Sequence, residues 1–360
     1  MMIVDAHEDI AWNILTFGRD YSRPVSETRA RETGSDTVAQ NGNTLLGLAD
    51  WISGGVAVVF ASLFAAPNRR KEGPWDTQCY QDEREASLLY SAQLDAYHRL
   101  IDRHPDGFQL ILTARDLEAL LSTWAAEGTR KRLGLVISME GADGVLDPRN
   151  LDEWYKRGVR IIGPAWSGTR YAGGTREPGP LTAAGFELLG AMAELGLALD
   201  LSHLAEEAVF QALDCFPGHI LASHSNCRAL LPNSPVPERH LPDAAIRCVA
   251  ERDGVIGIVP YNRFLMDGWQ PADGREHVTI GHVVAHIDHI CQLLGNADYV
   301  GLGSDFDGGF GLEAVPSGLD SVADLRFIGD ALRSRGYLES DVEAMMSGNW
   351  LRLLRRILKE

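Results

Sequence analysis

The feature that most constrains this chain is a regular alternation of short apolar runs with longer segments of helical period. Eight runs rich in β-branched residues recur along its 360 residues. They lie near 3–6, 56–64, 133–139, 159–165, 197–202, 219–223, 254–261 and 299–304. Such continuously apolar runs are typical of strands in a parallel sheet that helices cover on both faces.

Segments of helical period follow most of these runs. They lie near 81–103, 115–127, 149–157, 181–195, 205–214, 242–252, 278–294, 321–334 and 339–358. Eight strand–helix alternations favour a closed (β/α)8 barrel over an open doubly wound sheet, because about 250 residues suffice for the barrel. No repeat or linker marks a boundary, so we predict one α/β domain over residues 1–360.

Two polar stretches, 19–43 and 66–83, hold much of the remaining length. Each follows a predicted strand and precedes a predicted helix, which would place it over the mouth of the barrel. A surface insertion and an active-site lid are equally good interpretations of both stretches.

Composition narrows the class of partner and the compartment. The chain has 50 acidic and 33 basic residues, and this balance argues against a nucleic-acid or anionic-membrane partner. Five scattered cysteines without a CxxC pair indicate neither a disulfide framework nor a zinc–thiolate site. With no leader and no membrane-length apolar run, we expect a cytoplasmic protein. The basic C-terminal segment 352–359 is expected to be an exposed helix face or a subunit contact. The oligomeric state is left open, and a homodimer is one alternative.

Potential metal ligands follow five of the eight runs. In a barrel the C-terminal strand ends converge, so residues far apart in sequence would meet there. Each of these residues, taken alone, has a purely structural interpretation. A histidine can be a hydrogen-bonded core residue, and Asp9 and Asp307 can be helix N-caps. Together they favour a metal site made of His7, Asp9, Glu140, His203, His224 and Asp305.

Imidazole and carboxylate groups suit Zn²⁺ or a similar divalent ion. Alternation along a strand puts His7 and Asp9 on one face and Glu8 on the other, so the HxD pair could hold one ion. His203 and His224 could hold a second. Glu140 could bridge two ions about 3.5–4 Å apart, with a bridging hydroxide as the nucleophile.

An ordered set of motifs along almost the whole chain resembles the membrane (renal) dipeptidase family of the amidohydrolase superfamily. The motifs are HxD at His7–Asp9, MEG at Glu140, LDLSH at 199–203, ASHS at 222–225, RHLPD at 239–243, HIDHI at 286–290, GLGSDFDG at 301–308 and GN at 348–349. The resemblance implies a (β/α)8 barrel with two zinc ions that hydrolyses dipeptides, including those with a C-terminal D-residue.

The same resemblance implies a role for each matching residue. His7 and Asp9 would bind one zinc, His203 and His224 the other, and Glu140 would bridge them. Asp305 would be the general acid/base. Arg239 would hold the carboxylate of the substrate, which a planar guanidinium can do bidentately.

The chain departs from the family pattern after the fourth run, where Trp166 stands in place of a histidine that contacts the substrate's carbonyl oxygen. An indole N–H can donate a hydrogen bond but cannot be a cation. Ser167, Arg170 and Tyr171 are nearby substitutes, and Tyr261 is expected to line the pocket. Phe64 is a softer departure, at a position where an aromatic hydroxyl is expected.

Three hypotheses follow. The first is a dipeptidase, or a hydrolase of N-acylated amino acids, with two zinc ions. The second, motivated by Trp166, is an amidohydrolase that acts on another amide, a lactone or an ester. The third is a metal-binding homologue with impaired catalysis, against which the presence of Asp305 argues.

Overall fold

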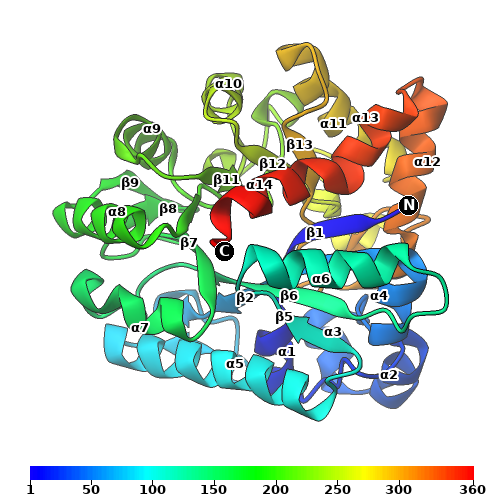
Figure 1. Ribbon diagram of the computed structural model, residues 1–360, viewed down its shortest axis with the longest axis horizontal. Helices are drawn as coiled ribbons and strands as arrows, with labels where there is room; N and C mark the ends of the chain where they lie inside the picture. Colours follow the sequence, from blue (N-terminus) through cyan, green and yellow to red (C-terminus); the bar gives the residue numbers. More distant parts are fainter.

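The computed structural model describes residues 1–360 and is built on a closed barrel of eight parallel strands (Figure 1). Neighbouring strands pair in sequence order around the ring, and β13 pairs with β1 to close it. The barrel strands are β1 (Ile3–Glu8), β2 (Val56–Phe64), β6 (Leu133–Glu140), β7 (Val159–Gly163), β10 (Ala198–Asp200), β11 (Ile220–Ala222), β12 (Val255–Ile258) and β13 (Val300–Leu302). The predicted (β/α)8 barrel and all eight predicted strands are confirmed.

Helices surround the barrel. Most helices predicted from the sequence are present with small shifts at their ends. The segment predicted as one helix over 339–358 is divided into α13, a π-helical turn at 344–348 and α14, and the helix predicted from 321 begins as a 3-10 turn before α12. Four helices between β1 and β2 were not predicted. The helices are α1 (Ile10–Phe17), α2 (Val25–Glu32), α3 (Asp36–Asn41), α4 (Leu48–Gly54), α5 (Glu83–Arg103), α6 (Ala114–Ala125), α7 (Leu151–Lys156), α8 (Ala183–Leu195), α9 (Glu206–Cys215), α10 (Asp243–Glu251), α11 (Ile280–Leu294), α12 (Arg326–Arg335), α13 (Glu339–Glu343) and α14 (Asn349–Ile357). Because all of them pack around one barrel, we interpret residues 1–360 as one domain.

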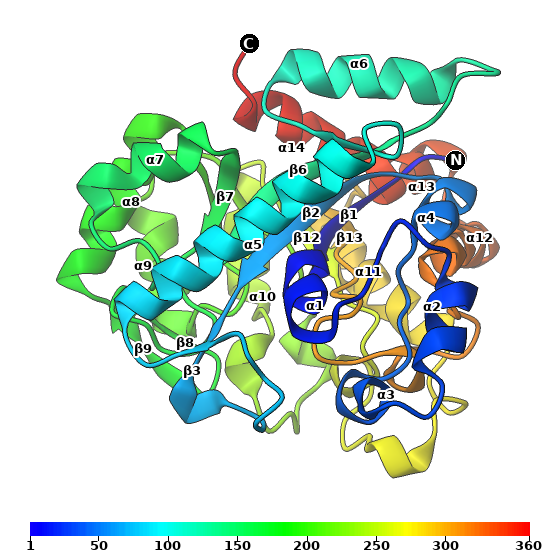
Figure 2. The ribbon, with the colours of Figure 1, turned by 90° about the horizontal axis from the view of Figure 1, so that it is seen from below.

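Short strands lie outside the ring. A ninth strand, β5 (Phe108–Leu110), extends the sheet beside β6, and β3 (Ala66–Pro67) pairs with β4 (Cys79–Tyr80). The antiparallel pair β8 (Ala172–Gly174) and β9 (Glu177–Leu181) forms a hairpin after β7. Figure 2 shows α6 and α14 at one end of the molecule and β3 with the β8–β9 hairpin at the opposite end.

Helix α14 closes the N-terminal end of the barrel. Trp350 is fully buried, contacts Phe60 edge to face at 5.3 Å, and donates its indole N–H to the carbonyl of Leu302 at 3.0 Å. The apolar side of α14 therefore seals this end, which leaves the C-terminal strand ends as the open mouth.

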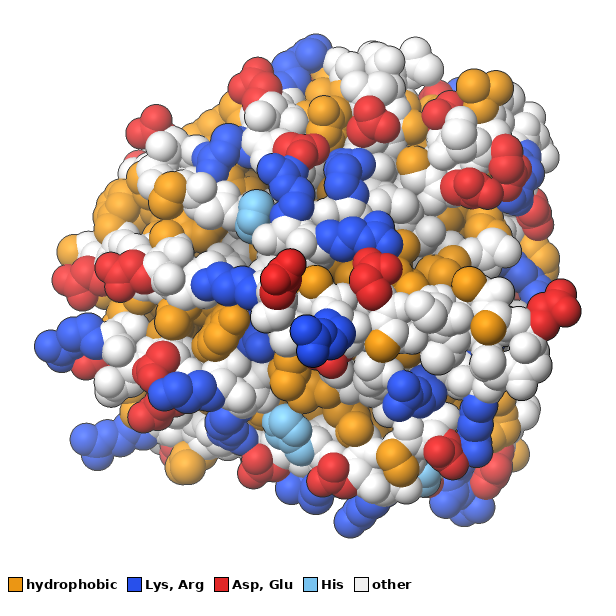
Figure 3. Space-filling view, viewed as in Figure 1, with side chains coloured by type: hydrophobic (Ala, Val, Ile, Leu, Met, Phe, Trp, Pro, Cys, Tyr) orange, Lys and Arg blue, Asp and Glu red, His pale blue; other side chains and the backbone are white.

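The exposed side of α14 is basic but locally neutralised. Arg355 pairs with Glu118 at 2.6 Å, and Arg356 pairs with Asp253. Acidic and basic side chains are interspersed over the face that carries α14 (Figure 3). None of the helices combines the length and the apolar character needed to cross a bilayer.

The two polar stretches differ in what they do. Stretch 19–43 folds into α2 and α3, and none of its residues lines the main cavity. Stretch 66–83 contributes Arg70, Glu72 and Asp76 to the cavity wall. The first is therefore a packed insertion, whereas the second forms part of the mouth.

Candidate metal centre and substrate cavity

The structure brings the six potential ligands together at the mouth of the barrel. All six are buried, although they come from β1, β6 and the ends of β10, β11 and β13. His203 and Asp305 have left-handed backbones, with φ of 68° and 57°. Such a conformation is uncommon for residues other than glycine and here bends the chain directly after a short strand.

Glu140 lies at the centre of the group. Its Oε1 is 2.9 Å from Nε2 of His203 and 3.2 Å from Nε2 of His224. Its Oε2 is 3.5 Å from Nε2 of His7. Each carboxylate oxygen thus faces a different set of imidazoles, which is the arrangement that a bridging ligand needs.

Two further carboxylates lie on the His7 side of the centre. Asp9 Oδ2 is 3.8 Å from Nε2 of His7, and Asp305 Oδ1 is 3.9 Å from the same nitrogen. The ligand atoms of His7, Asp9 and Asp305 lie within 4.8 Å of one another, as do those of His7, Glu140 and His224.

The donor set fits divalent cations. Both ring nitrogens of His7 are buried without a hydrogen-bond partner, and buried polar atoms normally have one. Nε2 of His203 lies 3.0 Å from Nε2 of His224, so both imidazoles face the same point. Nitrogen and carboxylate ligands around such unpartnered atoms suit Zn²⁺ or a similar ion.

The charges in this cluster shift one another's pKa. Burial would raise the pKa of Glu140, but the imidazoles of His7 and His203 and the hydrogen bonds that it accepts hold it well below its usual range. Burial, together with the charge of Arg239, lowers the pKa of His203 to about 4. Burial raises the pKa of Asp305 well above its usual range, and the charges of Asp9 and Glu140 add to that rise. Glu140 is therefore set to be a carboxylate ligand, and the raised pKa of Asp305 makes its carboxylate a stronger base that can accept a proton and then pass it on.

A surrounding layer of hydroxyl groups orients the ligands. Thr175 Oγ1 lies 3.0 Å from Nδ1 of His203, and Ser223 Oγ lies 2.6 Å from Nδ1 of His224. Ser62 donates a hydrogen bond to Asp9. Contacts of this kind fix ring orientation in metal sites. None of the three hydroxyls was predicted from the sequence, and only Ser223, which precedes the ligand His224 in ASHS, has a recognisable signal there.

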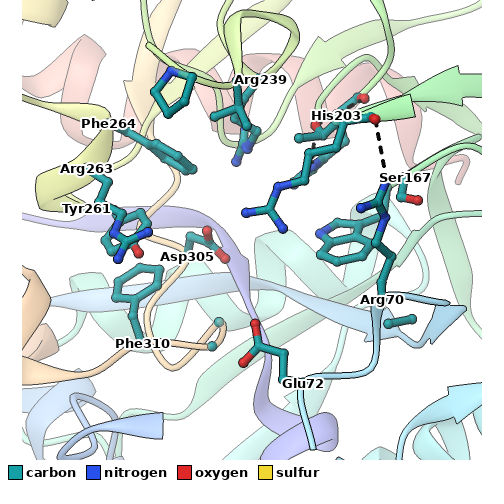
Figure 4. A pocket seen from close by; sticks show the side chains of 18 of the residues that line it. Arg70, Glu72, Ser167, His203, Arg239, Tyr261, Arg263, Phe264, Asp305 and Phe310 are labelled. Carbon is teal, nitrogen blue, oxygen red and sulfur yellow. Dashed lines mark hydrogen bonds between the residues drawn. The ribbon is translucent and has the colours of Figure 1, made fainter. Parts of the chain in front are cut away.

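A cavity of about 320 Å³ opens over the metal centre, a size that suits a small ligand (Figure 4). Arg239 lines it and is 2% exposed. Its Nη1 donates to the carbonyl of His224 at 2.6 Å, while Nε and Nη2 are buried without partners. These unpartnered N–H groups can take a carboxylate.

Aromatic side chains form much of the remaining cavity wall. Trp166 contacts Phe64 edge to face at 5.0 Å and lies 6.2 Å from the ring of His203. On the other side Tyr261 stacks on Phe310 at 4.2 Å. The two positions that depart from the family pattern therefore touch each other, and both line the cavity.

Of the proposed substitutes near Trp166, only Ser167 lines the cavity. Arg170 and Tyr171 both donate to the carbonyl of Val145 instead. Arg228, which lies near Arg239 in the sequence, pairs with Glu206 and lies outside the cavity, so it does not compete with Arg239 for a substrate carboxylate.

The two histidines of HIDHI make structural contacts away from the cavity. His286 accepts the backbone N–H of Cys227 at 3.1 Å, and His289 lies 2.8 Å from Asp243. Neither lines the cavity.

The N-cap interpretation of Asp307 is wrong. Asp307 is fully buried with a left-handed backbone, accepts hydrogen bonds from Tyr21 and Thr44, and pairs with Arg19 at 3.1 Å. It ties the insertion after β1 to the end of β13. Asp9 does precede α1, but its side chain makes no capping hydrogen bond.

Comparisons with known proteins agree with this geometry. The family model described as membrane dipeptidase (peptidase family M19) matches residues 1–359. An uncharacterised protein in the pqqA 5′ region of Klebsiella pneumoniae is 32% identical over 280 residues, which is 74% of this chain and 96% of that protein. Dipeptidase tcpJ of Claviceps purpurea is 28% identical over 276 residues, or 74% of this chain and 59% of that protein.

Solved structures give the same result over the full length. A metallopeptidase from Rhodobacter sphaeroides, bound to a phosphinate mimic of the dipeptide L-Ala-D-Ala, has a TM-score of 0.77 and 25% identity. The match covers 99% of both chains. A structure described as dipeptidase AC, of family M19, has a TM-score of 0.78 and 26% identity, and covers 100% of this chain and 99% of that one.

Proposed function

Because this chain belongs to the membrane dipeptidase family, M19, we propose that it is a hydrolase with two zinc ions that cleaves small dipeptides, including those with a C-terminal D-residue. The observation that carries the proposal is the placement of Glu140, whose two oxygens face His203 and His224 on one side and His7 on the other.

In this proposal each ion has its own pair of ligands. His7 and Asp9 would hold one ion, His203 and His224 would hold the other, and Glu140 would contact both. The bound ions would polarise the scissile carbonyl and lower the pKa of a shared water toward about 7, which supplies a nucleophile at neutral pH.

The protein supplies the proton transfer and the orientation. Asp305 lies at the His7 side of the centre, where its carboxyl group can take a proton from the nucleophile and pass it to the leaving amine. Arg239 binds the substrate's carboxylate through its two unpartnered N–H groups. Trp166 and Tyr261 enclose the substrate between them.

Trp166 favours a second candidate function. The indole of Trp166 cannot carry a positive charge beside the scissile carbonyl, as the imidazole of the family pattern can. Loss of such a hydrogen-bond donor typically lowers the rate on the order of 10²–10³-fold. An amide, lactone or ester that needs less stabilisation there would be the alternative substrate. A homologue that binds metal without turnover is the third possibility, against which the buried Asp305 argues.

Turnover of a substrate panel by zinc-loaded protein tests the proposal. We expect hydrolysis of L-Xaa-D-Xaa and L-Xaa-L-Xaa dipeptides, its loss after chelation, and a large drop in kcat for Asp305→Asn. Hydrolysis of lactones or esters alone would establish the alternative. Turnover of nothing in the panel by a metal-loaded protein would point to the binding homologue.

A further inference from the structure

Two carboxylates on stretch 66–83 line the cavity and have no assigned role. Asp76 is 5% exposed, and its Oδ2 accepts a hydrogen bond from the thiol of Cys79 at 3.0 Å. Its Oδ1 is buried without a partner. Glu72 lies four residues earlier, at the rim, and Figure 4 shows its carboxylate directed into the cavity. A buried oxygen without a partner in the protein is free to accept a hydrogen bond from a ligand.

Aromatic rings hold this stretch against the first helix. Trp75 stacks on Phe17 with centroids 5.6 Å apart and meets Trp12 edge to face at 6.3 Å. Trp12 and Trp75 both line the cavity beside the two carboxylates. Indole faces next to carboxylates are a favourable environment for an ammonium group.

No basic side chain of the protein forms an ion pair with either carboxylate. Arg70 is committed to Glu177 at 2.7 Å, and neither Glu72 nor Asp76 lies within ion-pair distance of an arginine or a lysine. Burial and the neighbouring Asp76 raise the pKa of Glu72, whereas the charges of Arg176 and Arg263, which line the same cavity, act in the opposite direction. Glu72 and Asp76 therefore have no ion-pair partner in the protein, and a cationic ligand could provide one.

The position of the pair matches the charge pattern of a free dipeptide. Arg239 and Glu72 extend into the cavity from opposite sides of Asp305 (Figure 4). A free dipeptide is a zwitterion with one charge at each end and the scissile bond between them. If Arg239 binds the carboxylate of a dipeptide, the ammonium group at the other end of that dipeptide lies toward Glu72 and Asp76.

We propose that Glu72 and Asp76 form a subsite for the α-ammonium group of the substrate's N-terminal residue. This inference rests on the proposed dipeptidase function and narrows the substrate class to dipeptides with a free amino terminus. N-acylated amino acids, which lack that charge, would be poor ligands.

Calorimetric binding to the zinc-loaded protein tests the subsite without requiring turnover. The two probes are a phosphinate mimic of L-Ala-D-Ala and the same compound without its amino group. We expect the amine to improve binding about 10–100-fold in the natural protein, the usual value of charged hydrogen bonds. In Glu72→Gln and Asp76→Asn the ratio of the two affinities should fall. The compound with the amino group should bind more weakly, and the affinity for the compound without it should not change.

Two control variants separate charge from folding. Glu83→Gln removes the same charge from an exposed residue that does not line the cavity. Cys79→Ala removes the contact that holds Asp76 and leaves both carboxylates. Both should retain the preference for the amine.

Equal affinity for the two probes in the natural protein, or an unchanged preference in Glu72→Gln and Asp76→Asn, would overturn the subsite. So would failure of the natural protein to bind either probe. The proposed function fails separately, if the zinc-loaded protein turns over no dipeptide in the substrate panel.

Discussion

Glu140 sits where several buried charges meet, and the neighbours of each charge decide its role. Glu8 shows the contrast with the adjacent His7 and Asp9. It is fully buried, its Oε1 accepts the indole N–H of Trp51 at 3.0 Å, and burial raises its pKa well above the usual range. The pleat of β1 thus directs alternate residues to the metal centre and to the core.

That contrast predicts metal content. His7→Ala or Asp9→Ala should reduce bound zinc from two ions per chain to one, because one pair of ligands is broken. Glu8→Gln should retain both ions, since the amide oxygen can still accept from Trp51. Elemental analysis of dialysed protein measures the ratio, and loss of metal in Glu8→Gln would contradict the assignment of faces.

Arg239 gives a second prediction at this scale. Arg239→Lys keeps a donor for the carbonyl of His224 but loses the bidentate geometry, so kcat/KM for a dipeptide should fall about 10–100-fold, mainly through KM. A dipeptide amide, which has no carboxylate, should show little difference between the two proteins. Equal losses for both substrates would mean that Arg239 acts only through the structure.

The functional residues differ in whether their roles could be predicted from the sequence. His7, Glu140 and His203 were predictable because strand ends in a barrel converge by rule. The roles of Asp307 and Asp76 were not predictable. Asp307 binds partners that lie hundreds of residues away in the sequence, and Asp76 is marked only by a buried oxygen without a partner. Local sequence contains neither kind of information.

At the scale of elements, strands and long helices were predictable and the loops were not. Stretch 19–43 is polar and yet forms α2 and α3, because Arg19 and Asn41 both donate to the buried Oδ1 of Asn13 and Arg19 also pairs with the distant Asp307. Stretch 66–83 has a similar composition but lines the cavity. Tertiary contacts, rather than propensity, separate the two.

Helix α11 provides a prediction about pH. Burial lowers the pKa of His286 to about 3, whereas an unfolded histidine titrates near 6.5. The unfolded chain therefore binds more protons between these values, so the stability that His286 contributes is complete above about pH 6.5 and falls as the pH drops toward 3.

His286→Asn retains an acceptor for the N–H of Cys227 and removes the titration. Between pH 7 and pH 5 the natural protein should lose about 2 kcal/mol more of its free energy of unfolding than the variant. Urea unfolding of both proteins in the same buffers measures the difference. Parallel stability curves would show that His286 is not held neutral in the folded state.

At the scale of the whole molecule, one end of the barrel provides stability and the other provides chemistry. Trp350 and α14 seal the N-terminal end, and every potential ligand lies at the opposite mouth. This division was predictable from the order of the eight strands. The substrate was not, because its recognition depends on the side chains and loops around the mouth, where Trp166 departs from the family pattern.

The central claim is that this mouth holds two metal ions around Glu140. Anomalous diffraction at the zinc edge from zinc-loaded crystals tests it most directly. We expect two peaks, one beside His7 and Asp9 and the other beside His203 and His224, with Glu140 between them. A single peak, or peaks away from Glu140, would contradict it.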